Sequence, residues 1–404
     1  MKQSVKFAAA MGALTLALTA CAGNGNVAQQ SDGAKAELPF KACAVSDTGG
    51  WQDKSFNQSA YDGLMEAKSF LGVTVDTAES DTVEDFTNNV EKMVDDSCTL
   101  IIGVGFHLEP AIHESALKHT DRNYALIDSG FSDGTNPVVL ENGRPLLFNT
   151  SEAAYLAGYA SAGMTTTGTL AVIGGSRDNV TASQMDAFAE GVDAYNLAKG
   201  TSITILGWNN ASKEGTFVDS AENVEATAAN FIAQGADIIL PLAGENNAGA
   251  ARAVAAAGNP MVRLIWSGLT KADLKGLTRD EAVSAESPMS GQAGPQVVEQ
   301  VDTQSFSDSF SYIQITDAVR SSIGAPVLTG IVLDYSAAMD TLISDATAGA
   351  PASTVPVSLV SGGVILTGFG AYTPMLSSDL KLGLSDMAGQ IETGGMVIST
   401  PFDV

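Results

Sequence analysis

The sequence is short of positive charge. Of its 404 residues, 20 are Lys or Arg and 46 are Asp or Glu, so the formal net charge is −26 at pH 7. Nucleic-acid binding relies on Lys and Arg to neutralise phosphates, and this balance argues against it. It equally argues against adhesion to anionic lipid through a basic patch. Hydrophobic residues make up 45% of the chain, so it is long and apolar enough for two folded domains.

The sequence also has few residues that suit catalysis or metal binding. Its three histidines, His107, His113 and His119, are six residues apart. Steps of that length advance about 600° around a helix, so successive histidines do not share a face. There is no H-E-x-x-H motif and no paired C-x-x-C motif, and the strand-end glycines complete no dinucleotide fingerprint. We therefore expect no enzyme, no catalytic residue, no cofactor and no bound metal.

The amino terminus has the pattern of an export signal followed by a tether. Lys2 and Lys6 precede a run of small and apolar residues at 7–20, which is shorter than the roughly 20 residues that span a membrane. The run ends in L-T-A-C, which resembles the lipobox of bacterial lipoproteins, where Cys21 would be acylated. An ordinary export signal with an incidental cysteine is the alternative. We expect a signal peptide at 1–20 and a flexible lipid-anchored tether at 21–39, on the extracytoplasmic face of a bacterial cell membrane.

Only two cysteines follow Cys21. Cys43 and Cys98 each lie at the start of an expected strand, and neighbouring parallel strands would bring these starts together. In an oxidising compartment such a pair suggests one disulfide. Two buried free thiols are the alternative reading.

Short apolar runs alternate with helix-like segments along most of the chain. Strands are expected at 42–46, 73–76, 100–104 and 124–128, and in a second series at 170–173, 203–206, 238–240 and 262–266. The runs are continuous, as in parallel strands that are covered on both faces. The pattern predicts an α/β fold with two doubly wound parallel-sheet lobes.

The carboxyl third is less regular, which makes the lobe boundaries harder to assign. A helix is expected near 312–322, a long helix at 328–346 and a last strand at 364–366. We predict an N-terminal lobe at 40–149, to which part of 267–335 returns. The C-terminal lobe is predicted to contain 150–266 and 336–404.

Ligands of such sheets bind at the carboxyl ends of the strands. The segments selected by this rule are 46–57, 105–107, 128–129, 174–177, 208–217, 243–246 and Ser267. The first holds hydrogen-bonding acids at Asp47 and Asp53, a ring at Phe56 that can stack on a flat ligand, and an amide at Asn57. An equally simple interpretation has Phe56 packed in the core and the acids solvated.

Residues 47–60, D-T-G-G-W-Q-D-K-S-F-N-Q-S-A, closely resemble the signature of the basic membrane lipoproteins, the substrate-binding lipoproteins of nucleoside ABC transporters. Weaker similarities follow in the family's order over roughly 40–266. These are A-L-I-D at 125–128, Glu152 with Y-L-A-G-Y-A at 155–160, I-G-G at 173–175, G-T-F-V-D at 215–219 and G-A-D-I-I at 235–239. The resemblance implies the type I periplasmic-binding-protein fold, with two lobes that close on a ligand.

The resemblance also implies roles for single residues. Phe56 and Phe217 would sandwich a purine ring, Asp128 and Asp53 would bind its polar edge, and Asp47 would hold sugar hydroxyls. The backbone at Gly244 would line the cleft. Trp51, Asn57 and Asp219 belong to the same matching motifs and complete the predicted ligand-binding set.

The carboxyl third departs from the family pattern. Ser267 stands where the family has an acid, Leu333 stands where it has a ribose-binding lysine, and 267–325 looks like an insertion. The expected function is capture of a purine nucleoside or related nucleobase compound by a monomer that works with an ABC permease. The alternative is a surface lipoprotein of the same fold that has lost transport and acts as a receptor or adhesion protein.

Overall fold

The structure is a computed structural model that describes residues 39–52, 56–132, 137–269, 274–275, 314–315 and 317–398. The predicted signal peptide, the tether with Cys21, Asp53 and most of the 267–325 segment lie outside these residues. Within them, no helix combines the length and apolar character that a membrane crossing needs.

The first lobe is built on a sheet of six parallel strands. In spatial order these are β17 (Val355–Val357), β7 (Gly143–Phe148), β4 (Asn123–Ile127), β3 (Leu100–Val104), β1 (Lys41–Val45) and β2 (Thr74–Ala78). Four longer helices belong to this lobe, namely α1 (Phe56–Leu71), α2 (Asp85–Asp95), α3 (Glu109–Lys118) and α11 (Tyr335–Thr347). A short 3₁₀ turn, η1 (Phe106–Leu108), follows β3, and β5 (Phe131–Ser132) pairs with β6 (Pro137–Val138).

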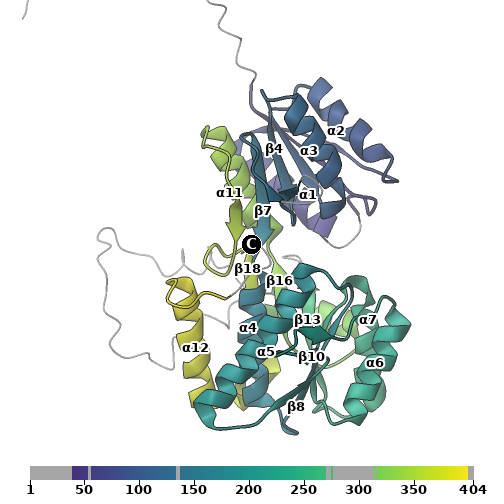
Figure 1. Cartoon of the computed structure of the whole chain (residues 1–404), viewed down its shortest axis with the longest axis vertical. Coiled ribbons are helices and arrows are strands. Elements are labelled where there is room, and N and C mark those ends of the chain that lie inside the picture. The colour runs from purple at the N-terminus through teal and green to yellow at the C-terminus, as the bar shows by residue number, and fades with distance from the viewer. Residues whose placement is uncertain are drawn as a thin grey trace, which may run out of the picture. The chain divides into compact units, whose positions relative to one another are not determined.

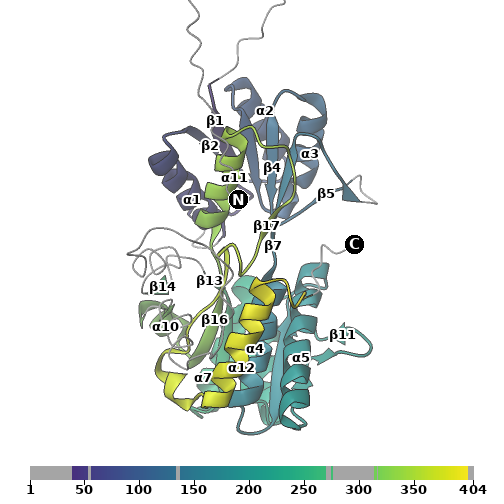
Figure 2. The same cartoon turned by 90° about the vertical axis from the view of Figure 1, so that its left-hand side faces the viewer.

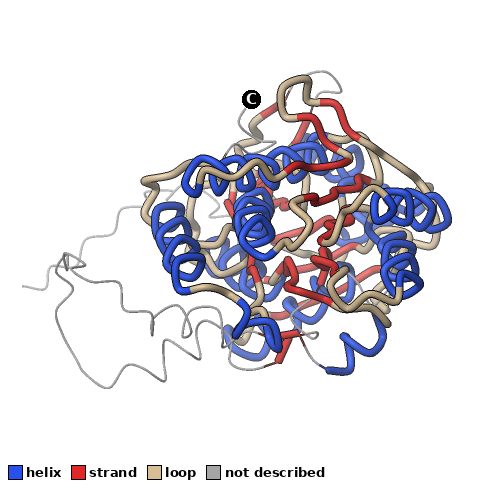
Figure 3. The backbone as a smooth tube through the Cα atoms, turned by 90° about the horizontal axis from the view of Figure 1, so that it is seen from below, coloured by secondary structure: helices blue, strands red, loops and turns tan. Residues whose placement is uncertain are grey.

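Helices lie on both sides of the strands in the view of Figure 3, and alternate residues of a strand point to opposite faces of its sheet. Ala42 and Ala44 of β1 are fully buried in the cluster that includes residues of α1 and α11. Cys43 and Val45 are fully buried in the cluster formed with α2 and α3. A strand buried on both faces must be apolar at every position, which explains the continuous apolar runs in the sequence.

The second lobe repeats this plan with one difference. Its sheet has the order β18 (Val364–Leu366), β16 (Val327–Leu333), β13 (Arg263–Leu269), β12 (Ile238–Leu242), β8 (Thr169–Gly174) and β9 (Thr204–Leu206). All pairs are parallel except β16 with β18, which is antiparallel. Its longer helices are α4 (Thr150–Met164), α5 (Asn179–Lys199), α6 (Ala221–Ala233), α7 (Asn247–Ala257) and α12 (Ser378–Glu392). The smaller elements are β10 (Trp208–Asn209), β11 (Glu214–Gly215), η2 (Gly244–Asn246), β14 (Leu274–Lys275), β15 (Gln314–Ile315), α10 (Asp317–Ile323) and η4 (Gly370–Met375).

Helices α4 and α5 pack so closely that glycine is needed at the contact. A Cβ atom at Gly158 would lie 2.1 Å from the carbonyl oxygen of Phe188, and one at Gly191 would lie 2.0 Å from that of Tyr155. No side chain fits at such distances, so the small residues of both helices are set by backbone-to-backbone packing. This contact explains why α4 is buried around most of its circumference.

Two predictions for the carboxyl third are wrong. Residues 327–333 form strand β16 and not the start of a long helix, because V-L-T-G-I-V-L is a buried β-branched run that extends the second sheet. The chain then returns to the first lobe, where β17 pairs with β7 and α11 packs on α1. Residues 335–357 therefore belong to the first lobe and not to the second, as Figures 1 and 2 show by the place of green α11.

A buried carboxylate ties together two of the places where the chain passes between the sheets. Glu152, in the first turn of α4, accepts hydrogen bonds from Asn149 Nδ2 at 2.8 Å and from the Leu359 amide at 2.9 Å. The backbone N–H of Asn149 donates to the carbonyl oxygen of Val357 at 2.7 Å. Burial raises the pKa of Glu152, and these donors oppose the rise by stabilising its charged form. The segment after β7 is thus fixed to the segment after β17.

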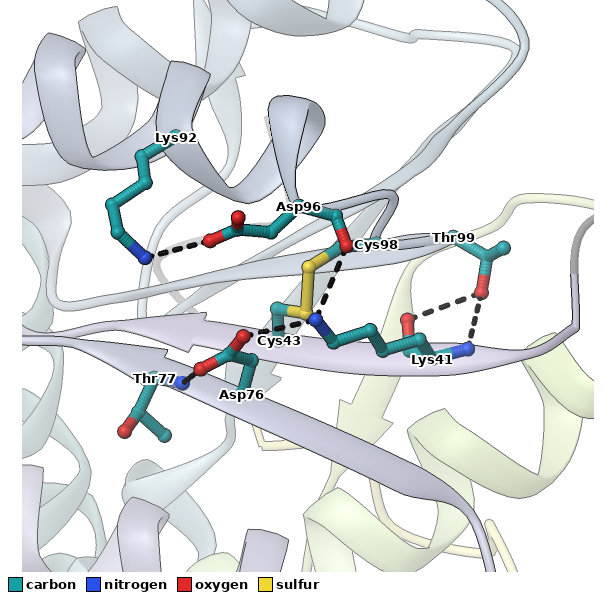
Figure 4. Close-up of polar contacts among 8 residues, drawn as sticks. All are labelled: Lys41, Cys43, Asp76, Thr77, Lys92, Asp96, Cys98 and Thr99. Atoms are coloured by element: carbon teal, nitrogen blue, oxygen red, sulfur yellow. Dashed lines mark hydrogen bonds and ion pairs between the residues drawn. A yellow bond between two sulfur atoms is a disulfide. The ribbon is translucent and has the colours of Figure 1, made fainter.

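Cys43 and Cys98 form a disulfide, which decides between the two alternatives that the sequence left open (Figure 4). The bridge joins β1 to the residue two positions before β3. Polar contacts surround it: Lys41 Nζ lies 2.9 Å from Asp76 Oδ2 and donates to the Asp96 carbonyl at 3.1 Å. The disulfide therefore joins β1 to the segment before β3, and the Lys41–Asp76 ion pair joins β1 to β2.

Candidate functional site

Two acids and a glycine follow three neighbouring strands of the first sheet. Asp47 follows β1, Gly105 follows β3 and Asp128 follows β4, and these strands are adjacent in the order β4, β3, β1. The carboxyl ends of parallel strands share one edge, so these positions are neighbours along it. This edge is where ligands of doubly wound sheets bind.

The structure places Asp47, Phe56 and Asn57 close together. Asn57 Nδ2 donates to Asp47 Oδ1 at 2.6 Å, and the Gly49 amide donates to the same oxygen at 2.9 Å. A Cβ atom at Gly105 would lie 3.3 Å from Asp47 Oδ2 and 3.4 Å from Phe56 Cε2. Asp47 is thereby held beside the half-buried ring of Phe56, at the start of α1.

Asp128 is the most unusual titratable residue at this edge. It is a non-glycine residue with φ of +66°, a conformation that Asp and Asn adopt more readily than other side chains. Burial raises the pKa of its carboxyl to about 6, and no cation or hydrogen-bond donor of the described chain is paired with it. A carboxylate placed in this way costs folding free energy, which is typical of functional sites.

Trp51 lies in the core of the first lobe, with 8% of its surface exposed. Its ring centroid lies 5.6 Å from that of Tyr61, and its amide donates to Glu79 Oε1 at 2.8 Å. The indole N–H is buried and has no acceptor among the described residues. A buried unpaired donor is uncommon in folded proteins and marks the position as special.

The second lobe presents Phe217 at the carboxyl end of β8. Residue 217 is bridged to Gly174, with backbone bonds of 2.9 Å from Gly174 to Thr216 and from Val218 to Gly174. A Cβ atom at residue 174 would lie 2.5 Å from Phe217 Cδ1. Glycine at this strand end is therefore required to seat the half-buried ring.

Arg177, to which the sequence analysis gave no role, stands next to this ring. Its Cζ lies 5.8 Å from the centroid of Phe217. Its Nη1 and Nη2 lie 2.9 and 3.0 Å from the two carboxylate oxygens of Glu214 in β11. The position falls within the strand-end segment 174–177, but nothing in the sequence pairs it with residue 214.

The other predicted positions have local contacts. Asp219 is exposed just before Ser220, which caps α6, and accepts a hydrogen bond from Asn223 Nδ2 at 3.3 Å. Gly244 has φ of +58° with open space where a Cβ would stand. Of the residues that depart from the family pattern, Ser267 lies in β13 and Leu333 is the half-buried last residue of β16.

The sequence also contains a spacing that resembles a hydrolase motif. Residues 130–134 have the G-x-S-x-G spacing of a hydrolase nucleophile, but Ser132 lies in short strand β5 and not at a strand-to-helix turn. The described residues contain no group of three or more His, Cys, Asp or Glu side chains that could hold a metal ion.

The fold consists of two lobes, each built on a six-stranded and mainly parallel sheet, and solved structures share it. The structure is similar to a solute-binding protein of an ABC transporter system from Aeropyrum pernix K1, with a TM-score of 0.59 and 19% identity over 90% of this chain and 94% of that one. It is also similar to a transcriptional activator of the comK gene from Bacillus halodurans, with a TM-score of 0.60 and 15% identity over 89% and 100%. These likenesses show the fold alone.

Residues 40–267, more than half of the chain, match the family of ABC transporter substrate-binding proteins described as PnrA-like. The chain therefore belongs to this family, whose members are binding proteins and not enzymes. It is 29% identical to the ABC transporter nucleoside-binding protein BmpA of Lactococcus lactis over 52% of this chain, and 28% identical to basic membrane protein D of Borreliella burgdorferi over 54%. The matches span 57% and 60% of those relatives, less than two thirds of their length.

Proposed function

We propose that this protein captures a purine nucleoside or a related nucleobase compound and delivers it to an ABC permease. In this proposal the chain is a monomer held by a lipid on Cys21 at the extracytoplasmic face of the membrane. The single observation that carries the proposal is the unpaired Asp128 carboxylate, which follows β4 at the same edge of the sheet where Asp47 follows β1. It is supported by the nucleoside-binding relative from Lactococcus lactis.

The chemistry of the edge suits a nucleobase. An ionised Asp128 accepts hydrogen bonds only, so it would pair with a ring N–H or an amino group. Such a ligand supplies the donor that the carboxylate lacks in the free protein. Asp53 would bind the same polar edge of the base, and Asp47 with Asn57 would bind sugar hydroxyls. Trp51 is included in the proposed site because its buried indole N–H has no acceptor among the described residues.

The aromatic residues suit a planar ligand. Phe56 at the start of α1 and Phe217 beyond the end of β8 are both half-buried, and each packs partly against the main hydrophobic cluster. A ring fixed in this way loses little rotamer freedom when a base stacks on it. In the proposed complex the two rings face opposite sides of the base, with Asp219 and the Gly244 backbone at the rim.

The charge of the site favours a nucleoside over a nucleotide. Asp47 and Asp128 repel a phosphate group, and the net charge of −26 adds to this effect.

We expect purine nucleosides to raise the melting temperature of the protein. At a hundredfold excess over Kd a ligand adds about 2.7 kcal/mol to the free energy of unfolding. Thermal-shift measurements with nucleosides, free bases and the matching nucleotides test this directly. An unchanged melting temperature with every purine and pyrimidine would contradict the proposal. It would favour a surface lipoprotein that has lost transport, an alternative supported by Ser267 and Leu333, which differ from the family pattern.

The Phe56→Ala substitution is expected to weaken nucleoside binding by about 5- to 150-fold, because stacking of a base on an aromatic ring contributes about 1–3 kcal/mol. Calorimetric titration would measure the loss. Phe70→Ala is the matched control, since Phe70 lies in the last turn of the same helix and is 76% exposed. Equal affinities for the two variants would refute the stacking role.

A further inference from the structure

The Arg177–Glu214 pair stands beside the ring that the second lobe offers to the ligand. Arg177 follows β8 by three residues, and Glu214 opens β11 of the small β10–β11 hairpin. Both guanidinium Nη atoms contact the Glu214 carboxylate, at 2.9 and 3.0 Å. This bidentate contact holds the planar guanidinium in one orientation. The Cζ of Arg177 lies over the Phe217 ring, 5.8 Å from its centroid.

The stability of the fold does not explain this arrangement. The side chains of Arg177 and Glu214 are 59% and 62% exposed. Solvent screens an exposed ion pair and an exposed cation over an aromatic ring, so both contribute little to the stability of the fold. The pair can therefore be removed with little effect on folding, so a substitution at Arg177 can test a role in binding without unfolding the protein.

The guanidinium adds a kind of group that the opposite edge does not provide. A guanidinium has five N–H donors, and two contacts to Glu214 leave three for other acceptors. Asp47 and Asp128, when ionised, offer only acceptors. A ligand that matches both sets presents an N–H donor to the carboxylates and a carbonyl oxygen to the guanidinium.

We infer that Arg177 is a specificity-determining residue that selects bases bearing a ring carbonyl. Building on the proposed function, this favours 6-oxopurine nucleosides over adenosine, which has an amino group at the same ring position. Glu214 is a positioning residue that keeps the guanidinium beside the Phe217 platform. An amino group facing Arg177 would place two donors against each other and would leave one of them unpaired.

The test compares inosine and adenosine as probes of the full chain and of two variants. Wild-type protein is expected to bind inosine at least tenfold more tightly than adenosine. The Arg177→Met variant is expected to lose at least tenfold in affinity for inosine and less than threefold for adenosine. Arg252→Met is the control, because Arg252 forms a similar exposed pair with Glu225, at 2.6 Å, between α7 and α6.

The outcomes separate this inference from the proposed function. If the wild type binds neither nucleoside, the proposed function fails and the role of Arg177 fails with it. If nucleosides bind and Arg177→Met leaves the inosine-to-adenosine ratio unchanged, only the role of Arg177 is overturned. The Arg177→Lys variant is a second test, because lysine keeps the positive charge but lacks the planar set of donors. Relative to Arg177→Met, it should restore less than half of the preference for inosine over adenosine, measured as the logarithm of the affinity ratio.

Discussion

Replacing Asp128 with Asn is expected to weaken ligand binding while making the free protein more stable. A hydrogen bond to a charged group contributes about 1.5–3 kcal/mol, so affinity for a purine nucleoside should fall by about 10- to 100-fold. The free energy of unfolding at pH 7 should rise by about 1–2 kcal/mol, because the amide removes a half-buried charge that has no partner. Asn also tolerates the positive φ at this position, so the backbone need not change.

The stability and the nucleoside affinity of the wild type should depend on pH in opposite ways. The folded-state pKa of Asp128, about 6, lies above the ordinary value of 3.8, so the folded protein prefers the protonated form. The wild type therefore loses stability as pH rises from about 4 through 6, and the advantage of the Asn variant is largest above that range. Nucleoside affinity of the wild type should fall as pH drops through about 6, because the protonated carboxyl no longer carries the accepting charge.

Urea unfolding and calorimetric titration at pH 5 and pH 8 measure both effects. Asp81→Asn is the control, since Asp81 is exposed in the loop between β2 and α2. Wild-type affinity in the Asp128→Asn variant would remove Asp128 from the site. A variant that binds weakly but is no more stable than the wild type would contradict the burial argument.

Loss of the Cys43–Cys98 disulfide is expected to lower the free energy of unfolding by about 4 kcal/mol, because the bridge closes a loop across a sequence separation of 55 residues. Both cysteines are fully buried, so mild reductant should act only after the protein opens. Urea unfolding of the wild type and of the Cys43→Ala/Cys98→Ala double variant, with and without reductant, measures the contribution. Cys21→Ala is the control, and equal midpoints for the double variant and the control would contradict the prediction.

The regular part of the fold could be predicted from the sequence because its signal is local. Strands buried on both faces are apolar at every position, and the predicted 100–104 coincides with β3. In the carboxyl third the same signal located β18 at the predicted 364–366, but it did not separate β16 from the helix that follows. Residues 327–333 run without a break into the apolar pattern of α11, so periodicity joined a strand to the following helix. The return of α11 and β17 to the first lobe depends on packing partners more than 200 residues away, which no local pattern records.

The candidate site divides in the same way. Asp47, Phe56 and Asn57 are close in sequence, and their juxtaposition follows from one strand-to-helix turn. The strand-end rule located Asp128, but its missing partner and raised pKa follow from the surrounding tertiary structure. Arg177 and Glu214 are 37 positions apart, and their contact is created by the approach of β11 to the end of β8. Trp51 could not be recognised as a core residue, since its neighbours in the sequence are small or polar.

The return of α11 to α1 has a consequence for biosynthesis. A Cβ atom at Gly63 would lie 2.9 Å from the Cα of Ser336, so these two helices fit together without room for a side chain. Until the ribosome has made residues 335–357, the apolar side of α1 has no cover and β7 forms a bare margin of its sheet. The amino-terminal half should therefore remain aggregation-prone and protease-sensitive as a nascent chain. A truncated chain that ends near residue 266 should aggregate and should not form a small independent domain.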